Sequence, residues 1–468
     1  MNALRHRVLS SYLLVVVVLF VACAAPAATP ADDGAAVGAD SADGTTATAA
    51  TPVVTWYYFD QNNTDPQANE RVGNFYLART IPLFNEAFAG QYEWVNVPRD
   101  YNLVLDLVTA VQNNGEIPDL MRTAAVDMPT FLLNNTVQDL TDFVQNATWY
   151  DAIDPAALAA CTGPDGNIYC VPVSSSPYVN FYWTERYPDG FPATTDAFLT
   201  AAEALKQEGH YALTYWGSTA FDGEAAGRYF YQVISSFGGS YDDGAGNMLL
   251  NTPENIAAIE FMRTIVEQGY SSESVFVGNF EEEAVFKIAE AGAFPTGFFV
   301  GYQYINPLTA PNGTVYETAT AEDMENAVKA GDIDISPLFA PAGMTPGCHL
   351  DVFGFVIPNG ANNVEGAQAY INWIMEPEQG VDWVLSAGGG IPVVDYLAED
   401  EAFQTEIFQK GAAAAEASDC QPWYGSLQRI PEAKVIITNV IFDLIKGDPT
   451  AEISPALTAA QEEYNADN

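Results

Sequence analysis

The sequence predicts an α/β fold built from two units. Residues 53–468 are too many for one hydrophobic core and suit two domains. Strand and helix patterns alternate as β-α-β-α-β at the start of this stretch, and a second alternation follows a Gly-Pro-Asp-Gly turn at 163–166. Strands that alternate with helices form parallel sheets with right-handed crossovers, so the first unit is expected to contain such a sheet.

The first unit begins with a strand over 53–59, because VVTWYYF is a β-branched and aromatic run. Pro82 must lie near the start or a kink of the next helix. Asn114-Gly115 is a typical helix end. The other elements expected before residue 160 are helices over 77–89, 101–113 and 128–134 and strands over 92–97 and 118–120.

The second unit is expected to run to about residue 292. Thr194 or Thr195 caps a helix that ends at Glu208, and Thr252-Pro253 begins another that ends at Gly269. The other elements expected here are strands over 179–183 and 211–215 and helices over 223–237 and 279–291. Beyond residue 292 we expect strands over 293–305, 333–341 and 352–358, then helices over 364–375, 378–386, 400–415, 431–446 and 453–465.

Residues 1–52 have the pattern of an export signal and a tether. A short basic head precedes an apolar run over 8–22, which is too short to cross a bilayer as a helix. Residues 23–52 are a low-complexity Ala, Thr, Gly, Asp and Pro stretch, typical of a flexible linker.

Cys23 follows the apolar run directly, and this arrangement resembles a bacterial lipoprotein. The resemblance implies a signal peptide over 1–22, lipidation of Cys23, and a folded part held at the outer face of the cytoplasmic membrane. Phe20 departs from the pattern, because such signals usually have Leu there. The alternative is a secreted protein cut near Ala25 or Ala28.

The net charge of −45 excludes partners that are themselves polyanions, such as nucleic acid or an anionic lipid surface. It does not require a cationic ligand, because surface acid also promotes solubility.

Four cysteines follow Cys23, and an even number in an exported chain predicts two disulfides with three possible connectivities. The turn at 163–166 brings Cys161 and Cys170 together, which leaves Cys348 with Cys420. The chain has no CxxC motif and three histidines, so we predict no metal site and no cofactor.

Seven segments resemble the extracellular solute-binding proteins of ABC importers, the large family that includes maltose- and other sugar-binding proteins. The most specific is GNIYCVPVSSSPYVNFYWTERY at 166–187, and the order and spacing of all seven carry the resemblance. They lie at 53–60, 80–88, 117–144, 166–187, 237–270, 288–299 and 371–393.

The resemblance implies a periplasmic-binding-protein type of fold, in which two α/β lobes joined by a hinge of crossing strands close on a ligand. The N-terminal lobe is expected to contain 53–160 and 293–360, and the C-terminal lobe 161–292 and 361–468. Such a protein captures a sugar or oligosaccharide without catalysis and delivers it to membrane permease subunits, and it acts as a monomer.

Ligands of α/β sheets lie at the carboxyl ends of strands, and sugars need aromatic faces and planar polar groups. Some of the aromatic candidates are expected to be core residues, and the Asp119 position is often structural in the family. From strand ends and from the resemblance together, the expected ligand-binding residues are Asp60, Gln61, Asp119, Ser176, Trp216, Phe298, Phe299, Tyr302, Asp351, Trp423 and Tyr424.

Two alternatives remain open. A polyamine or other cation binder needs acids and aromatics, both present in this chain, and its affinity falls steeply with salt. A secreted glycoside hydrolase needs two carboxylates about 5–10 Å apart, which 61 acidic residues supply by chance.

Overall fold

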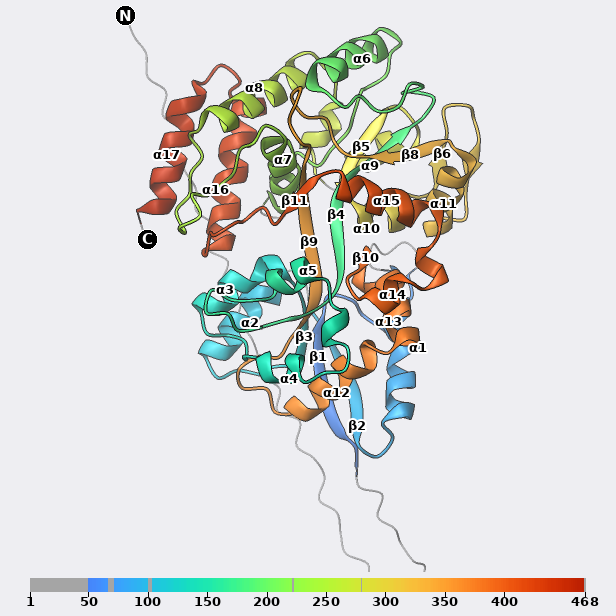
Figure 1. The fold of residues 1–468 in the computed structure, drawn as a ribbon, viewed down its shortest axis with the longest axis vertical. Coiled ribbons are helices and arrows are strands. Elements are labelled where there is room, and N and C mark those ends of the chain that lie inside the picture. The colour runs from blue at the N-terminus through green and yellow to red at the C-terminus, as the bar shows by residue number, and fades with distance from the viewer. Residues whose placement is uncertain (1–48, 66–70, 100–102, 221–222, 279, 467–468) are drawn as a thin grey trace, which may run out of the picture. The chain divides into compact units, whose positions relative to one another are not determined.

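The computed structural model describes residues 49–65, 71–99, 103–220, 223–278 and 280–466 (Figure 1). The predicted signal peptide, Cys23 and nearly all of the tether lie outside these residues. The described part is a mixed α/β fold, as predicted. None of its helices is both long and apolar enough to cross a membrane.

One mixed sheet organises the fold, with strand order β10-β4-β9-β3-β1-β2. Strand β11 also pairs with β9, and β5 and β8 also pair with β4. The strands of this sheet are β1 (Thr51–Tyr57), β2 (Tyr92–Pro98), β3 (Leu120–Ala124), β4 (Val171–Trp183), β5 (Ala293–Gly297), β8 (Ile333–Ser336), β9 (Gly347–Val356), β10 (Ile391–Pro392) and β11 (Asp419–Gln421). A separate hairpin joins β6 (Leu308–Thr309) to β7 (Val315–Tyr316).

Strand β1 pairs in parallel with β2 and with β3, as the β-α-β-α-β pattern predicts. Thr55 lies opposite Asn96 on one side and Leu120 on the other. The carboxyl ends of the three strands therefore meet at one edge of the sheet, which is where ligands of α/β folds bind.

Two long strands, β4 and β9, run antiparallel to each other and connect two ends of the fold (Figure 1). The first part of β4 pairs with β10 through Ser174 and Ser175, and its last part pairs with β5 and β8 from Tyr178 onward. Nearly every residue of β4 is buried because it has neighbours along its whole length.

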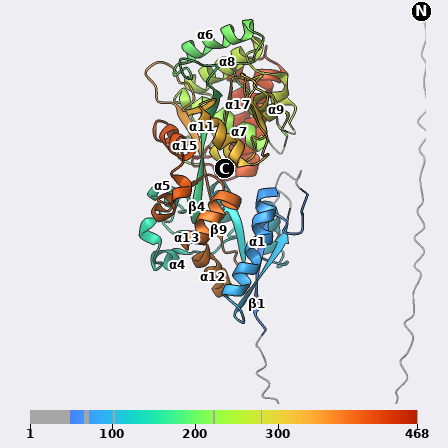
Figure 2. The same cartoon turned by 90° about the vertical axis from the view of Figure 1, so that its right-hand side faces the viewer.

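We call the end that carries β1, β2 and β3 the β1 half, and the other end the α7 half. In both views α1, α12 and α13 lie at the β1 half, whereas α6, α8 and α17 lie at the α7 half (Figure 1, Figure 2). The helices are α1 (Arg71–Ala87), α2 (Leu103–Gln112), α3 (Met128–Leu133), α4 (Thr141–Gln145), α5 (Pro155–Ala160), α6 (Thr195–Gln207), α7 (Glu224–Ser236), α8 (Pro253–Glu267), α9 (Glu281–Lys287), α10 (Phe298–Gln303), α11 (Ala321–Ala330), α12 (Val364–Ile374), α13 (Pro377–Trp383), α14 (Asp395–Ala398), α15 (Glu406–Glu416), α16 (Ile430–Phe442) and α17 (Ile453–Asn465).

Two segments pack at the opposite half from the one expected. Strands β5 and β8, within 293–360, pair with the α7 end of β4, whereas α12 packs on β1. The reason is that the chain changes halves at each crossing strand. It enters the α7 half along β4 and returns along β9, so α12 and α13, which follow β9 directly, lie at the β1 half, whereas the last helix, α17, lies at the α7 half again (Figure 1).

Two expected strands differ in the structure. The strand expected over 293–305 ends at Gly297, and α10 begins at Phe298. Residues 211–215 form only isolated bridges, Tyr211 to Ala291 and Leu213 to Ser271.

Local signals for helix ends and disulfides are confirmed. The Thr194 and Thr252 hydroxyls accept hydrogen bonds from the backbone N–H groups of Ala197 and Asn255, as N-caps do. Both expected disulfides are present, Cys161–Cys170 and Cys348–Cys420.

Candidate ligand-binding site at the crossing strands

The loop after β1 holds the first two candidates, at the carboxyl edge of the sheet. The Gln61 Oε1 atom accepts a hydrogen bond from Asn96 Nδ2 at 2.8 Å. The Asp60 Oδ1 atom accepts one from the backbone N–H of Asn62, also at 2.8 Å. Both side chains are partly exposed, so each keeps acceptor capacity for a ligand.

Asp119 lies before β3 rather than after it, so it is not at this edge. Its Oδ2 atom accepts from the Val54 N–H at 2.8 Å, and its Oδ1 atom accepts from the Asn363 N–H at 2.7 Å. The buried carboxylate thus ties β1 to the start of α12, which is the structural role that the family pattern allowed.

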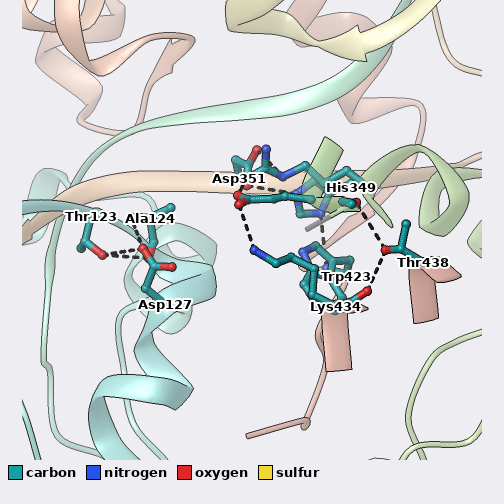
Figure 3. A network of polar contacts seen from close by, with 11 residues as sticks. Thr123, Ala124, Asp127, His349, Asp351, Trp423, Lys434 and Thr438 are labelled. Atoms are coloured by element: carbon teal, nitrogen blue, oxygen red, sulfur yellow. Dashed lines mark hydrogen bonds and ion pairs between the residues drawn. The ribbon is translucent and has the colours of Figure 1, made fainter. Parts of the chain in front are cut away.

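Asp351 is buried on β9 and belongs to a network of charged side chains (Figure 3). Its Oδ2 atom is 3.3 Å from Arg228 Nε on α7, and its Oδ1 atom is 3.0 Å from His349 Nε2. Arg228 Nη2 also contacts Glu224 Oε1 at 2.6 Å, and Lys434 Nζ on α16 lies 3.3 Å from Glu224 Oε2. We call Asp351, His349, Arg228, Glu224 and Lys434 the charge network.

The charge network keeps its acids ionised. Burial raises the pKa of Asp351, but Arg228 and His349 outweigh burial and the net shift is downward. For Glu224, burial likewise raises the pKa, and Arg228 and Lys434 lower it below its usual range. The network is therefore a set of mutually neutralised charges beside the crossing strands.

His349 connects this network to the late segment after β11. The backbone N–H of Trp423 donates to His349 Nδ1 at 3.3 Å. Because Nδ1 accepts there, the ring proton is on Nε2, which donates to Asp351. The Cys348–Cys420 disulfide fixes the same segment to β9 one residue away.

Two residues of the β1 half meet this region from the other side. The Tyr424 hydroxyl donates to the Ala125 carbonyl at 3.0 Å, which links the late segment to the end of β3. Asp127 accepts from Thr123 Oγ1 at 2.9 Å, and burial followed by the nearby Glu224 carboxylate raises the pKa of Asp127 to about 6. The two halves therefore contact each other here through polar groups.

Three candidates on or beside α10 pack mainly with other aromatic rings. Phe298 and Tyr302 stack on each other at 6.2 Å and both contact Phe408. Phe299 is buried next to Gly389, where an added Cβ would lie 2.1 Å from the Phe299 ring. Phe298 and Tyr302 therefore belong to the hydrophobic core, which the sequence analysis allowed for some of the three.

Ser176 is buried on β4 and accepts a hydrogen bond from the Phe299 N–H at 3.1 Å, so it positions the start of α10. Trp423 is also buried, and its ring contacts Tyr241 edge-on at 6.2 Å. Its indole Nε1 has no hydrogen-bond partner among the described residues.

Trp216 follows the 211–215 segment, as expected, and 9% of the residue is exposed. Its ring meets Phe294 of β5 edge-on at 6.0 Å. It lines a cavity together with Glu282, a residue that the sequence analysis did not select.

Most of the charge network was not predicted from the sequence. Glu224 and Arg228 have the i, i+4 spacing of an intrahelical ion pair, but that spacing does not reveal a partner on β9. Among the residues that the structure describes, no three His, Cys, Asp or Glu side chains gather in a way that holds a metal ion.

Comparisons with solved structures show the fold. The chain is similar to the maltose-bound MalE3 of T. maritima, with 16% identity, a TM-score of 0.70, and coverage of 90% of this chain and 100% of that one. It is also similar to the GacH receptor of Streptomyces glaucescens, with 15% identity, a TM-score of 0.70, and coverage of 89% and 98%. A third example is an ABC transporter solute-binding protein of Thermotoga lettingae, with 18% identity, a TM-score of 0.66, and coverage of 89% and 99%.

No curated protein sequence matches the chain significantly. The model of a protein family, the bacterial extracellular solute-binding proteins, matches residues 81–412. This match covers more than half of the chain, and the overall fold is similar to that of the solved structures. The chain belongs to the family of bacterial extracellular solute-binding proteins.

Proposed function

We propose that this protein is the carbohydrate-binding component of an ABC importer. The observation that carries the proposal is the family match together with a fold shared with binding proteins of known ligand. Those relatives were solved with maltose, with acarbose and with α-D-tagatose. All three ligands are neutral or weakly charged polyhydroxy compounds, which hydroxyl-pairing and aromatic side chains bind.

Closure of the β1 half on the α7 half is the proposed means of capture. The contact of Tyr424 with Ala125 supports it, because this hydrogen bond joins the two halves and needs both in place. A ligand that contacts both halves stabilises the closed form over the open one. The residues proposed to contact it are Asp60, Gln61, Trp216, Phe299 and Tyr424.

The cation-binding alternative is disfavoured by the charge network. The buried Asp351 and the partly exposed Glu224 are already neutralised by Arg228 and Lys434. A polyamine would have to displace these cations, which costs the desolvation of a buried ion pair.

We further propose that Cys23 carries a lipid that anchors the protein outside the cytoplasmic membrane, and that the protein acts as a monomer with permease subunits of an importer. Globomycin treatment, which blocks lipoprotein signal cleavage, tests the anchor. The treatment should make the precursor accumulate in the wild type, whereas a Cys23→Ser variant, which has no thiol to lipidate, should look the same with and without it.

A thermal-shift series with maltose, acarbose, tagatose and spermidine tests the ligand class. A bound ligand at 100 times its Kd adds about 2.7 kcal/mol to the stability. Stabilisation by a sugar that is recovered intact supports the proposal. Stabilisation by spermidine alone overturns it in favour of cation binding, and cleaved sugar overturns it in favour of a hydrolase.

A further inference from the structure

Trp216 and Glu282 face one small cavity in the α7 half. The cavity has a volume of about 30 Å³, and its walls are small or apolar apart from these two side chains and one serine. Its lining residues are Trp216, Ser218, Ala220, Ala225, Gly278, Phe280 and Glu282.

Two polar atoms at this cavity lack partners. The Trp216 Nε1–H and the Glu282 Oε2 atom are buried without a hydrogen bond to any described residue. Glu282 as a whole is 4% exposed and Trp216 is 9% exposed. A buried donor and a buried acceptor left unpaired are each unfavourable, so each of these atoms would gain from a hydrogen-bonding partner.

The size of the cavity limits that group. About 30 Å³ holds one or two water-sized groups, far less than a sugar ring. A hydroxyl fits the chemistry, because it accepts a hydrogen bond from an indole N–H and donates one to a carboxyl oxygen. An ammonium group does not fit, because it has no acceptor for the indole N–H.

The cavity is next to α7, the helix that carries Glu224. Ala225, one of its walls, follows Glu224 in α7, and the Glu224 carboxylate is close enough to Asp127 of the β1 half to raise the pKa of Asp127. Burial also raises the pKa of Glu282 to about 7, because desolvation disfavours the charged carboxylate.

We propose that Trp216 Nε1–H and Glu282 Oε2 form a subsite that binds one hydroxyl group of the ligand, with the indole donating and the carboxyl accepting. The inference deepens the proposed function and rests on it for the identity of the ligand. In this subsite the edge of the Trp216 ring, and not only its face, recognises the ligand, and Glu282 is a specificity-determining residue.

Glu283 provides a matched control. It is the next residue of α9, it is 6% exposed, and burial raises its pKa to about 7 as well. However, its Oε2 atom already pairs with Lys287 Nζ at 3.3 Å. Glu282→Gln and Glu283→Gln therefore make the same chemical change at two buried carboxyls, only one of which faces the cavity.

The experiment follows the Trp216 indole N–H signal by NMR in the full chain, with the signal identified by its loss in Trp216→Phe. The probes are maltose, acarbose, tagatose and glycerol, the last as a small hydroxyl donor independent of the importer role. A probe that binds should shift the signal. Glu282→Gln and Trp216→Phe should each weaken binding about 5- to 30-fold, and Glu283→Gln should change it less than twofold.

The outcomes separate the two proposals. If a sugar binds with no shift of the Trp216 signal and equal affinity for Glu282→Gln, the subsite is wrong and the importer role stands. If no sugar binds but glycerol shifts the signal in the wild type and not in Glu282→Gln, the subsite stands and the sugar assignment fails. If no probe shifts the signal, the cavity holds structural water and the subsite is overturned.

Discussion

Asp351 and Glu282 are buried to nearly the same extent, 5% and 4% exposed. The surroundings of Asp351 nevertheless stabilise a negative charge on its carboxyl group, whereas those of Glu282 destabilise one. Asp351 faces Arg228 and His349, and its pKa is lowered. Among the residues that the structure describes, no cation offsets the burial of Glu282, and burial raises its pKa to about 7.

This contrast shows that the neighbouring charges, rather than the extent of burial, decide whether the pKa of a buried carboxyl is raised or lowered. In the charge network each acid is neutralised within the protein, so the network stabilises the contact region around the crossing strands. At the Trp216–Glu282 cavity the polar atoms are left for another molecule. The same comparison separates residues that hold the fold from residues available to a ligand.

Replacement of Arg228 by Met should produce the largest effect, because it leaves Asp351 as a buried acid whose neighbouring cation has been removed. Breaking a buried pair in this way costs about 3–5 kcal/mol. Urea denaturation of the full chain measures it. The matched control is Arg79→Met, which breaks an exposed ion pair with Asp382 and should cost under about 1 kcal/mol. Equal losses for the two variants would contradict the role given to the charge network.

The two disulfides also differ in what they hold in place. Only Cys348–Cys420 holds the segment after β11, which contacts the charge network through Trp423 and His349. Cys348–Cys420 closes a loop with a sequence separation of 72 and fixes the chain before Trp423, whereas Cys161–Cys170 closes a separation of 9. Chain entropy predicts losses of about 4 and about 2.5 kcal/mol when each pair is replaced by Ala. Only the Cys348→Ala/Cys420→Ala variant should also weaken sugar binding. An equal loss of affinity in both variants would show that the late segment is not positioned by its disulfide.

Features set by local chemistry were predictable from the sequence. The Thr252 cap, the Cys161–Cys170 turn and the parallel order of β1, β2 and β3 depend on residues near each other in the chain. The position of Trp216 after the 211–215 segment was predictable for the same reason.

Features set by tertiary pairing were not predictable. Arg228 and Asp351 are separated by 123 positions and meet only because α7 packs on β9. Similarly, Phe298 becomes a core residue because β5 stops at Gly297 and the following helix turns its ring toward Phe408. A hydrophobic run alone does not specify which of its residues end in the core.

Changing the two compared carboxyls should shift the stability in opposite directions. The pKa of Glu282, about 7, lies above the unfolded value near 4.5, so the native state binds more protons between these values and stability falls as pH rises through this window. Glu282→Gln should therefore raise the stability at pH 8, by about 1–3 kcal/mol. The pKa of Asp351 is lowered, so its contribution is present at neutral pH and is lost as pH falls through the folded value. Asp351→Asn should lower the stability at pH 8, and thermal melts of both variants at pH 4, 6 and 8 measure the two signs.

Replacement of Asp127 should have the smallest effect on stability. Like Asp351, Asp127 has hydrogen-bonding partners, but like Glu282 it has a raised pKa. It keeps hydrogen bonds from Thr123 and the Ala124 N–H, but burial and the Glu224 carboxylate raise its pKa to about 6. The native state therefore binds more protons than the unfolded chain between about pH 4 and 6, and stability falls as pH rises through that window. Asp127→Asn should remove this part of the pH dependence and leave the stability at pH 4 nearly unchanged. Because Asp127 and Glu224 lie on opposite halves, the same variant should tighten sugar binding slightly at pH 8 by removing a repulsion across the contact. If the sugar affinity has the same pH dependence in the wild type and the variant, the repulsion between Asp127 and Glu224 does not oppose closure of the two halves.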